Sequence, residues 1–419
     1  MRNLKPRVRP HNPLPESPYE VLALFTVAMV GSSLWLMSTG ALMPFFTSAL
    51  HVDQAQLGTI LSVQFFGSVA MTSVAGVLTD RFGDKAVVFW SGAIMGVALL
   101  AASLVQNFTW LVVWLLVYGV GYAAATPAGS HAIIFFFRKA DRGLAMGVRL
   151  CGVPLAGVLG SVLLPAIALH FQYRGALAVA GLITLIGSSL ASALSREPRE
   201  LRGERASVGD LFAEMLAIAR ESRLILLTLT SMILFCAQLA LMGFFTLTLV
   251  HRAGYSVSLG VALFTLAQLA AVVGRLSWGW LSDRVFGGSR ALPLAVNCVL
   301  VALTTFVVST VTPAMPPWVA GALAFALGFT AEGWFGVSTI GFAEIGGEER
   351  SGSALGVGLT FTLLAGFVTP PVFGALVQSY GYPASWRALA LFEAFGVIPA
   401  LLASRAAIRR RDPASTSAA

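Results

Sequence analysis

The sequence predicts an all-α membrane protein with twelve transmembrane helices in two pseudo-symmetric lobes of six. Three observations predict this fold class: the composition, the number of long apolar runs, and a repeat that relates the two halves of the chain. Hydrophobic residues make up 57% of the 419 residues and charged residues 11%, against about 45–50% and about 25% in soluble domains. So little charge cannot cover a soluble globule of this size, and so apolar a chain is not disordered.

The apolar runs give the order of the predicted elements, since a spanning helix needs about 20 mostly apolar residues. The runs lie at roughly 20–48, 55–79, 85–105, 109–137, 142–169, 174–194, 223–250, 257–282, 290–311, 317–343, 352–378 and 384–404. The intervening segment 195–222 is rich in charge and predicts a cytoplasmic linker with an amphipathic helix. The predicted domains are therefore a tail 1–19, a lobe 20–194, the linker 195–222, a lobe 223–404 and a tail 405–419.

The basic residues predict the orientation of these helices. Of the 27 Lys and Arg, 22 fall on the two tails and the loops of one side, three fall on the opposite loops, and two lie inside helices. Positive residues accumulate on cytoplasmic loops, so we expect a multi-pass protein of the cell membrane, embedded in its lipid bilayer, with both termini in the cytoplasm. The net charge of +8 is thus a matter of topology and does not indicate nucleic-acid binding.

Features of enzymes are missing from the sequence. It contains no phosphate-binding loop, no metal-ligand cluster and no nucleophile triad. The three cysteines, Cys151, Cys236 and Cys298, are far apart in apolar runs and form neither a zinc motif nor a disulfide framework. We therefore expect no catalytic residues, no metal, no cofactor and no ATP-driven step.

A repeated motif relates the two halves. GVLTDR at 76–81 recurs as GWLSDR at 279–284, as expected for a transporter built from internal repeats. Small residues such as Gly76 and Gly279 permit close helix packing, and a carboxylate at a helix end can pair with a neighbouring Arg. The first copy and its repeat resemble the signature of the major facilitator superfamily, although Asp84 replaces a residue that is usually basic. The resemblance implies conformational gating by the residues Gly76, Asp80, Arg81, Gly83, Gly279, Asp283 and Arg284.

Two arginines carry the prediction of a substrate. Arg149 and Arg275 each lie about eight residues inside a helix, about 10–12 Å from the cytoplasmic surface at 1.5 Å per residue. A charge at that depth normally faces a cavity, although a long Arg side chain can also extend toward the surface. Arg suits a carboxylate because its fork is bidentate and always charged. The sequences around both residues resemble the anion-handling branches, such as the oxalate–formate, monocarboxylate and cyanate transporters.

The resemblance also names candidates for the remaining roles. Helices one, four, seven and ten line the cavity in this superfamily, which implies that substrate is bound by Trp35, Tyr118, Tyr122, Gln238 and Trp334. Glu332 is the deepest acidic residue of the second lobe and is the candidate proton carrier. The alternative for Glu332 is an ion pair with Arg275 or a hydrogen bond to the backbone.

We therefore expect a monomeric secondary active transporter of a small, monocarboxylate-like organic anion. Alternating access with proton symport would move the substrate. The alternative is a proton-coupled exporter of drugs or metabolites with the same fold, in which a carboxylate contacts a cationic substrate. A receptor or sensor on this fold has little support, because the tails are short and no signalling domain is present.

Overall fold

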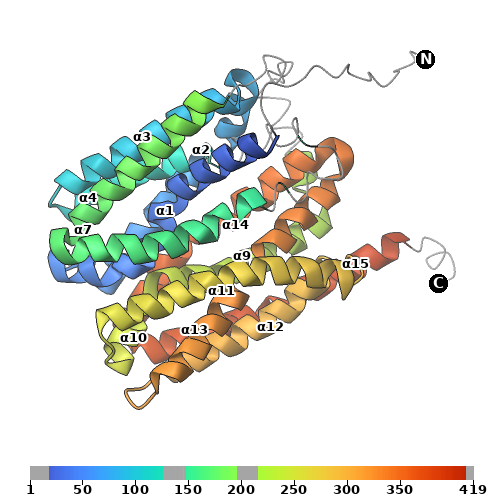
Figure 1. Ribbon diagram of the computed structural model, residues 1–419. Coiled ribbons are helices and arrows are strands. Elements are labelled where there is room, and N and C mark those ends of the chain that lie inside the picture. Colours follow the sequence, from blue (N-terminus) through green and yellow to red (C-terminus); the bar gives the residue numbers. More distant parts are fainter. Residues whose placement is uncertain (1–17, 126–136, 138–144, 146–147, 196–215, 412–419) are drawn as a thin grey trace.

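The computed structural model of the chain is a bundle of helices (Figure 1). It describes residues 18–125, 137, 145, 148–195 and 216–411, without the side chains of residues 70, 73–74, 76–77, 80–81, 348–352 and 407–411. Within these residues every regular element is a helix and there is no strand. Most of the linker that the sequence predicts at 195–222 lies outside the described residues.

The first group of helices precedes the linker. It consists of α1 (Pro18–Leu50), α2 (Gln54–Phe82), α3 (Asp84–Leu104), α4 (Phe108–Tyr122) and α7 (Gly152–Leu194). Tight caps separate the first three: Asp53 accepts a hydrogen bond from the Gln56 backbone in a capping box, and Gly83 joins α2 to α3 at φ 85°. Within α7, Gln172 takes φ 58° and turns the chain back, so that α7 comprises two antiparallel helices.

The second group of helices follows the linker. It consists of α9 (Ser222–Ala240), the π-helical turn η2 (Leu241–Phe245), α10 (Thr246–Ala253), α11 (Val257–Arg284), α12 (Ala291–Val308), α13 (Pro317–Ala331), α14 (Phe335–Phe395) and α15 (Val397–Arg411). Glycines at positive φ, Gly347 at 69° and Gly381 at 76°, break α14 into three segments. The first segment continues α13, and the last continues into α15.

These bends account for the number of membrane crossings. Eight helical stretches of the described residues are long and apolar enough to cross a membrane, and two of them, Val148–Leu194 and Ser353–Ala406, contain a bend that doubles them. Together with α2 and α4, which complete the series, the described residues trace twelve crossings. The predicted all-α membrane fold is confirmed.

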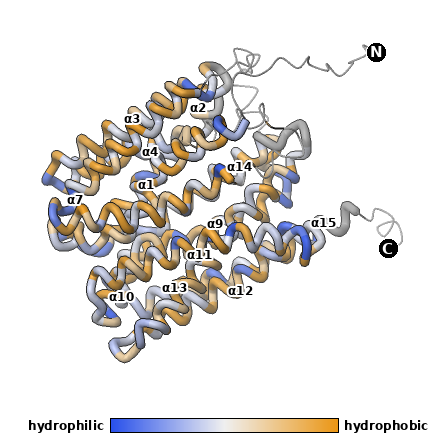
Figure 2. Tube along the Cα trace, in the orientation of Figure 1, coloured by the Kyte–Doolittle hydropathy of each residue, from blue (hydrophilic) through white to orange (hydrophobic). Residues whose placement is uncertain are grey.

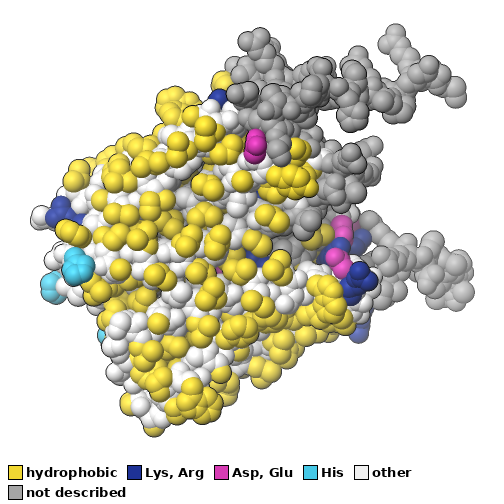
Figure 3. Space-filling model, viewed as in Figure 1, with side chains coloured by type: hydrophobic (Ala, Val, Ile, Leu, Met, Phe, Trp, Pro, Cys, Tyr) yellow, Lys and Arg dark blue, Asp and Glu magenta, His cyan; other side chains and the backbone are white. Residues whose placement is uncertain are grey.

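The surface of the bundle fits a lipid environment. Apolar residues dominate the helices along their length (Figure 2), and the visible face is mostly hydrophobic between two ends that carry the charged and His side chains (Figure 3). Helix α1 begins and helix α15 ends at the same end of the bundle (Figure 1), which we call the termini end. The opposite end, with the loop between α3 and α4 and the loop between α12 and α13, is called the far end.

The two groups of helices touch through small residues, which let backbones approach. A β-carbon at Gly40 of α1 would lie 1.9 Å from the Met242 carbonyl oxygen, and one at Gly58 of α2 would lie 2.2 Å from that of Pro370. Ser161 of α7 also exchanges a hydrogen bond of 2.8 Å with Thr265 of α11. At these points the two groups are held together by close backbone approach and by a side-chain hydrogen bond.

Candidate functional site

Arg275 of α11 lies where the two groups of helices meet. Its Nη1 donates a hydrogen bond of 3.4 Å to the carbonyl oxygen of Leu150, which belongs to the first group. Tyr122 and Cys151, also of the first group, are close enough to interact with it electrostatically. The guanidinium stands 5.3 Å from the ring centre of Phe335, and its buried Nε has no hydrogen-bond partner. Arg275 is therefore a positive charge that lies between the two groups of helices and can still donate a hydrogen bond.

Glu332 is the acidic residue that accompanies Arg275. It is fully buried at the end of α13, where the helix is interrupted before α14, and it interacts electrostatically with Arg275. Its Oε1 accepts a hydrogen bond of 2.8 Å from Nε2 of Gln268, while its Oε2 has no partner. Burying a carboxylate oxygen without a hydrogen-bond partner costs free energy. A proton or a hydrogen-bond donor of a ligand at Oε2 would remove that cost. Among the described residues, the Glu332 carboxylate forms neither of the two alternatives, an ion pair with Arg275 or a hydrogen bond to the backbone.

Aromatic rings connect Arg275 to the first group of helices. Trp334 packs edge-on against Phe335 at 5.6 Å and against Phe235 of α9 at 6.1 Å. Phe235 in turn meets Phe65 of α2 at 5.5 Å. The indole nitrogen of Trp334 donates to the carbonyl oxygen of Ala331, so Trp334 presents only its apolar surface to these neighbours.

The other predicted binding residues lie at different distances from this centre. Tyr118 and Tyr122 stack at 6.1 Å, but the Tyr118 hydroxyl already donates to the carbonyl oxygen of Ser32 at 2.6 Å. Trp35 is buried against Phe46. Gln238 is buried with an unpartnered Oε1. Of these residues, Tyr122 interacts electrostatically with Arg275.

Arg149 has a different environment from Arg275. It is 1% exposed, and its Nη2 donates a hydrogen bond of 2.8 Å to the carbonyl oxygen of Ala125, just past α4. Asp84, buried in the first turn of α3, interacts with it electrostatically. The Arg149 guanidinium therefore points into the first group of helices, toward the acid that replaces a basic residue in the first motif. The two arginines donate to different backbone carbonyls, Arg149 to that of Ala125 and Arg275 to that of Leu150.

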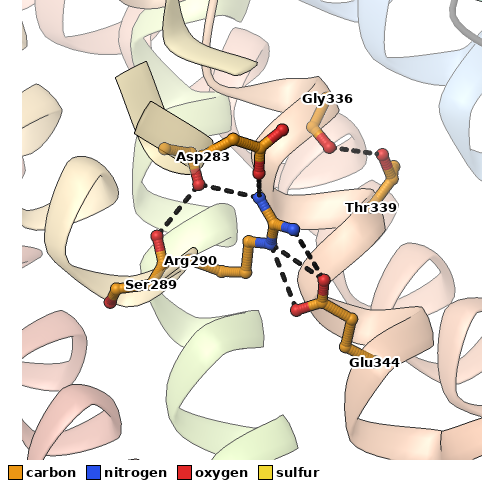
Figure 4. Close-up of polar contacts among 7 residues, drawn as sticks. Asp283, Ser289, Arg290, Gly336, Thr339 and Glu344 are labelled. Carbon is orange, nitrogen blue, oxygen red and sulfur yellow. Dashed lines mark hydrogen bonds and ion pairs between the residues drawn. The ribbon is translucent and has the colours of Figure 1, made fainter. Parts of the chain in front are cut away.

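The second copy of the motif forms a charge cluster at the termini end (Figure 4). Arg290 pairs with Asp283 at the end of α11 and, at 2.7 Å, with Glu344 of α14. Burial lowers the pKa of Arg290, but its hydrogen bonds to Glu344 and Asp283 outweigh this and raise the pKa above its ordinary value. Asp283 thus pairs with Arg290, while Arg284 is exposed. The cluster joins α11, α12 and α14 within the second group.

The glycines of the motif differ in what they do. Gly83 supplies the positive φ of the turn between α2 and α3. At Gly279 a β-carbon would meet nothing within 4 Å, so the close helix packing expected there is wrong for this structure. The side chains of Asp80 and Arg81, and the surroundings of Gly76, lie outside the described residues.

Several residues of the site were assigned no role from the sequence. Gln268, Phe235 and Phe335 complete the surroundings of Glu332 and Arg275, and Glu344 completes the charge cluster. A polar residue in an apolar helix is a usable signal for Gln268. The 28 phenylalanines of the chain give no such signal, because aromatic residues face lipid and protein alike.

Comparisons with known proteins agree with this architecture. A family model of the Major Facilitator Superfamily matches residues 22–345. An uncharacterized MFS-type transporter of Mycobacterium tuberculosis is 26% identical, over 86% of this chain and 80% of the relative. Monocarboxylate transporter 13 of Bos taurus is 28% identical over 84% and 81%, and an agnestins efflux protein of Paecilomyces divaricatus is 23% identical over 82% and 77%.

A solved structure shares the fold. The crystal structure of a bacterial homolog of the human lysosomal transporter Spinster, in an inward-facing and unoccupied conformation, superposes with a TM-score of 0.77. It covers 93% of this chain and 97% of its own, at 17% sequence identity.

Proposed function

The chain belongs to the major facilitator superfamily, and on this premise we propose that it is a secondary active transporter of a small, monocarboxylate-like organic anion. The observation that carries the proposal is Arg275, a permanent charge between the two groups of helices with donor capacity left. A carboxylate fits an Arg fork in two parallel hydrogen bonds. Relatives named as a monocarboxylate transporter and as an efflux protein support transport and leave its direction to experiment.

In this proposal the two groups of helices are the lobes 20–194 and 223–404, which alternate in giving access to Arg275. The termini end is the cytoplasmic end, in line with the distribution of Lys and Arg, and the protein works as a monomer in the cell membrane. Close contacts between the lobes, as at Gly40 and Gly58, close one face of the site. The charge cluster of Asp283, Arg290 and Glu344 belongs to the gating machinery, as does the first motif copy.

Proton symport is the proposed source of energy. Glu332 has one unpartnered carboxylate oxygen and interacts with Arg275, so an anion and the ionised Glu332 compete for the same positive charge. Binding of the anion is then favoured when Glu332 carries a proton, which couples the two without direct contact. Arg149, Tyr118, Trp35, Gln238 and Trp334 support or line the path in this proposal, and Tyr122 lies nearest to Arg275.

The test is uptake of radiolabelled lactate, benzoate and oxalate into proteoliposomes under an inward proton gradient. Replacing Arg275 by Gln should weaken the apparent affinity about 10- to 150-fold, since a hydrogen bond to a charged group contributes about 1.5–3 kcal/mol. Arg275→Lys should recover only part of the affinity, because a lysine lacks the fork. The exposed Arg252 of α10 offers a matched control, and Arg252→Gln should transport normally.

Two outcomes would overturn the proposal. Unchanged anion uptake by a well-folded Arg275→Gln variant, judged by size-exclusion chromatography, removes Arg275 from the site. Transport of cationic drugs in exchange for protons, with no accumulation of any of the three anions, would identify the alternative function, a proton-coupled exporter.

A further inference from the structure

The line of contact between α7 and α11 holds a close steric contact and a hydrogen bond, one helical turn apart. A β-carbon at Gly157 of α7 would lie 2.4 Å from Oε1 of Gln268 on α11, so the amide of Gln268 is pressed against the α7 backbone. One turn along, Ser161 and Thr265 share a hydrogen bond of 2.8 Å. We call this pair of contacts, Gly157–Gln268 and Ser161–Thr265, the seam. It joins the first group of helices to the second.

Gln268 also connects the seam to the buried carboxylate. Its Nε2 donates 2.8 Å to Oε1 of Glu332, and its own Oε1 is buried at Gly157 without a hydrogen-bond partner. An ionised carboxylate only accepts hydrogen bonds, so it requires the NH₂ side of the amide and directs the amide oxygen to Gly157. A protonated Glu332 keeps an acceptor oxygen and gains an O–H donor, so it can bond either side of the amide, and Gln268 is then free to turn over.

The ionisation of Glu332 is coupled to the charged and titratable groups around it. Arg275 is the charged group that acts on Glu332, from the same helix as Gln268. From the first group of helices, Tyr122 and Cys151 face Arg275 in turn. Arg275 stabilises ionised Glu332 and also donates a hydrogen bond to Leu150 of the first group. Loss of the Glu332 charge therefore alters two contacts with the first group: that of Gln268 with Gly157 and that of Arg275 with Leu150.

We propose that Gln268 is a positioning residue that transmits the ionisation of Glu332 to the seam between α7 and α11. Ionised Glu332 holds the amide against Gly157 and keeps the seam closed. Protonation frees the amide to turn over and so loosens the seam, which shifts the two groups of helices toward a state that is open at the far end. The inference rests on the proposed function in assigning Glu332 the proton, and it is independent of the substrate.

The experiment measures the separation of the two groups by electron-spin distance measurements on the reconstituted protein without any anion. Spin labels are placed on Gln106 and Ala314, which are exposed in far-end loops of the first and second group, after replacement of the three native cysteines by alanine. Spectra are recorded at about pH 5 and about pH 8. The parent protein should show more of the longer distance at the lower pH, by about 5- to 150-fold in the ratio of the two states, the usual range of coupling between sites.

Variants distinguish the coupling of Glu332 to the seam from the stability of the seam itself. Glu332→Gln should show the longer distance at both pH values, and Gln268→Leu should lose the pH response. Thr265→Val removes the Ser161 hydrogen bond without touching Glu332, so it should shift the ratio at both pH values yet keep the response. Gly157→Ala, which displaces the amide from the other side, should mimic Gln268→Leu.

A Gln268→Leu protein that keeps the full pH response would overturn the inference, as would a pH response in Glu332→Gln of parental size. Because no anion is present, a chain that transports another class of substrate gives the same distances. Failure of the anion assay with Arg275 variants therefore bears on the proposed function alone.

Discussion

Gly40→Ala is predicted to separate the two groups of helices at their tightest backbone approach. The added β-carbon would lie 1.9 Å from the carbonyl oxygen of Met242 and 2.9 Å from the ring of Phe264. Ordinary contact begins at 3.4 Å, so α1 and η2 must part by about 1.5 Å there. A carbonyl oxygen cannot turn aside as a side chain can. The strain can be relieved only by moving the α1 backbone away from that of η2.

The magnitude follows from the cost of overpacking. An extra carbon forced into a packed contact costs about 1–3 kcal/mol. Because α1 and η2 belong to different groups, a state in which the groups have parted at the far end escapes this cost. The substitution should therefore raise the ratio of parted to closed molecules by about 5- to 150-fold, with little change in the stability of either group by itself.

The assay is the distance between spin labels on Gln106 and Ala314, measured with and without the substitution. Gly187→Ala is the matched control, since a β-carbon at Gly187 of α7 would meet nothing within 4 Å; alanine there should leave the distances unchanged. The reasoning is refuted if Gly40→Ala gives the parental distance distribution. A lower thermal stability with unchanged distances would mean that the strain is absorbed within one group.

Three further predictions concern single side chains. Arg290→Ala should lower the stability in thermal unfolding by about 1 kcal/mol, because a half-exposed ion-pair cluster contributes little. Arg284→Ala, at an exposed residue, should leave the stability unchanged. Equal losses in the two variants would show that the cluster does not stabilise the fold. An anionic thiol reagent should modify Cys151 faster than a cationic one of the same size because Arg275 lies nearby, and Arg275→Gln should remove this preference; a preference that persists in mass spectrometry contradicts the placement. Tyr118→Phe should cost about 1 kcal/mol of stability through the lost hydrogen bond to the backbone, with anion affinity unchanged; a selective loss of affinity would place the hydroxyl in the site.

Much of the fold could be predicted from the chain, and the reason is the solvent. Lipid satisfies no backbone hydrogen bonds, so each crossing must be a helix of about 20 apolar residues. Loops stand out by their charge, and bends by residues such as Gly83, Gly347 and Gly381 at positive φ. Gln172 gave no comparable signal, although it takes φ 58° between two apolar runs that the sequence had already separated.

Less of the site could be predicted, because it depends on which way each helix is turned. Glu332 and Arg275 were recognised as charges in apolar helices. Gln268 joins them only because α13 packs on α11, and its contact with Gly157 requires the approach of a helix from the other group. For residues more than 60 positions apart in the chain, no local sequence pattern predicts such a contact.

The two buried arginines show where the sequence stops and the tertiary structure decides. Sequence alone predicted the number of crossings, the repeat, and a similar depth for Arg149 and Arg275, since each follows from apolar run lengths along one chain. Packing decided their directions: Arg149 turns toward Asp84 and the Ala125 carbonyl inside the first group. Arg275 instead meets Leu150 across the two groups. Depth is a property of one helix, whereas the partner of a buried charge is a property of the helices packed around it, because the charge turns toward whichever acceptors its neighbours supply.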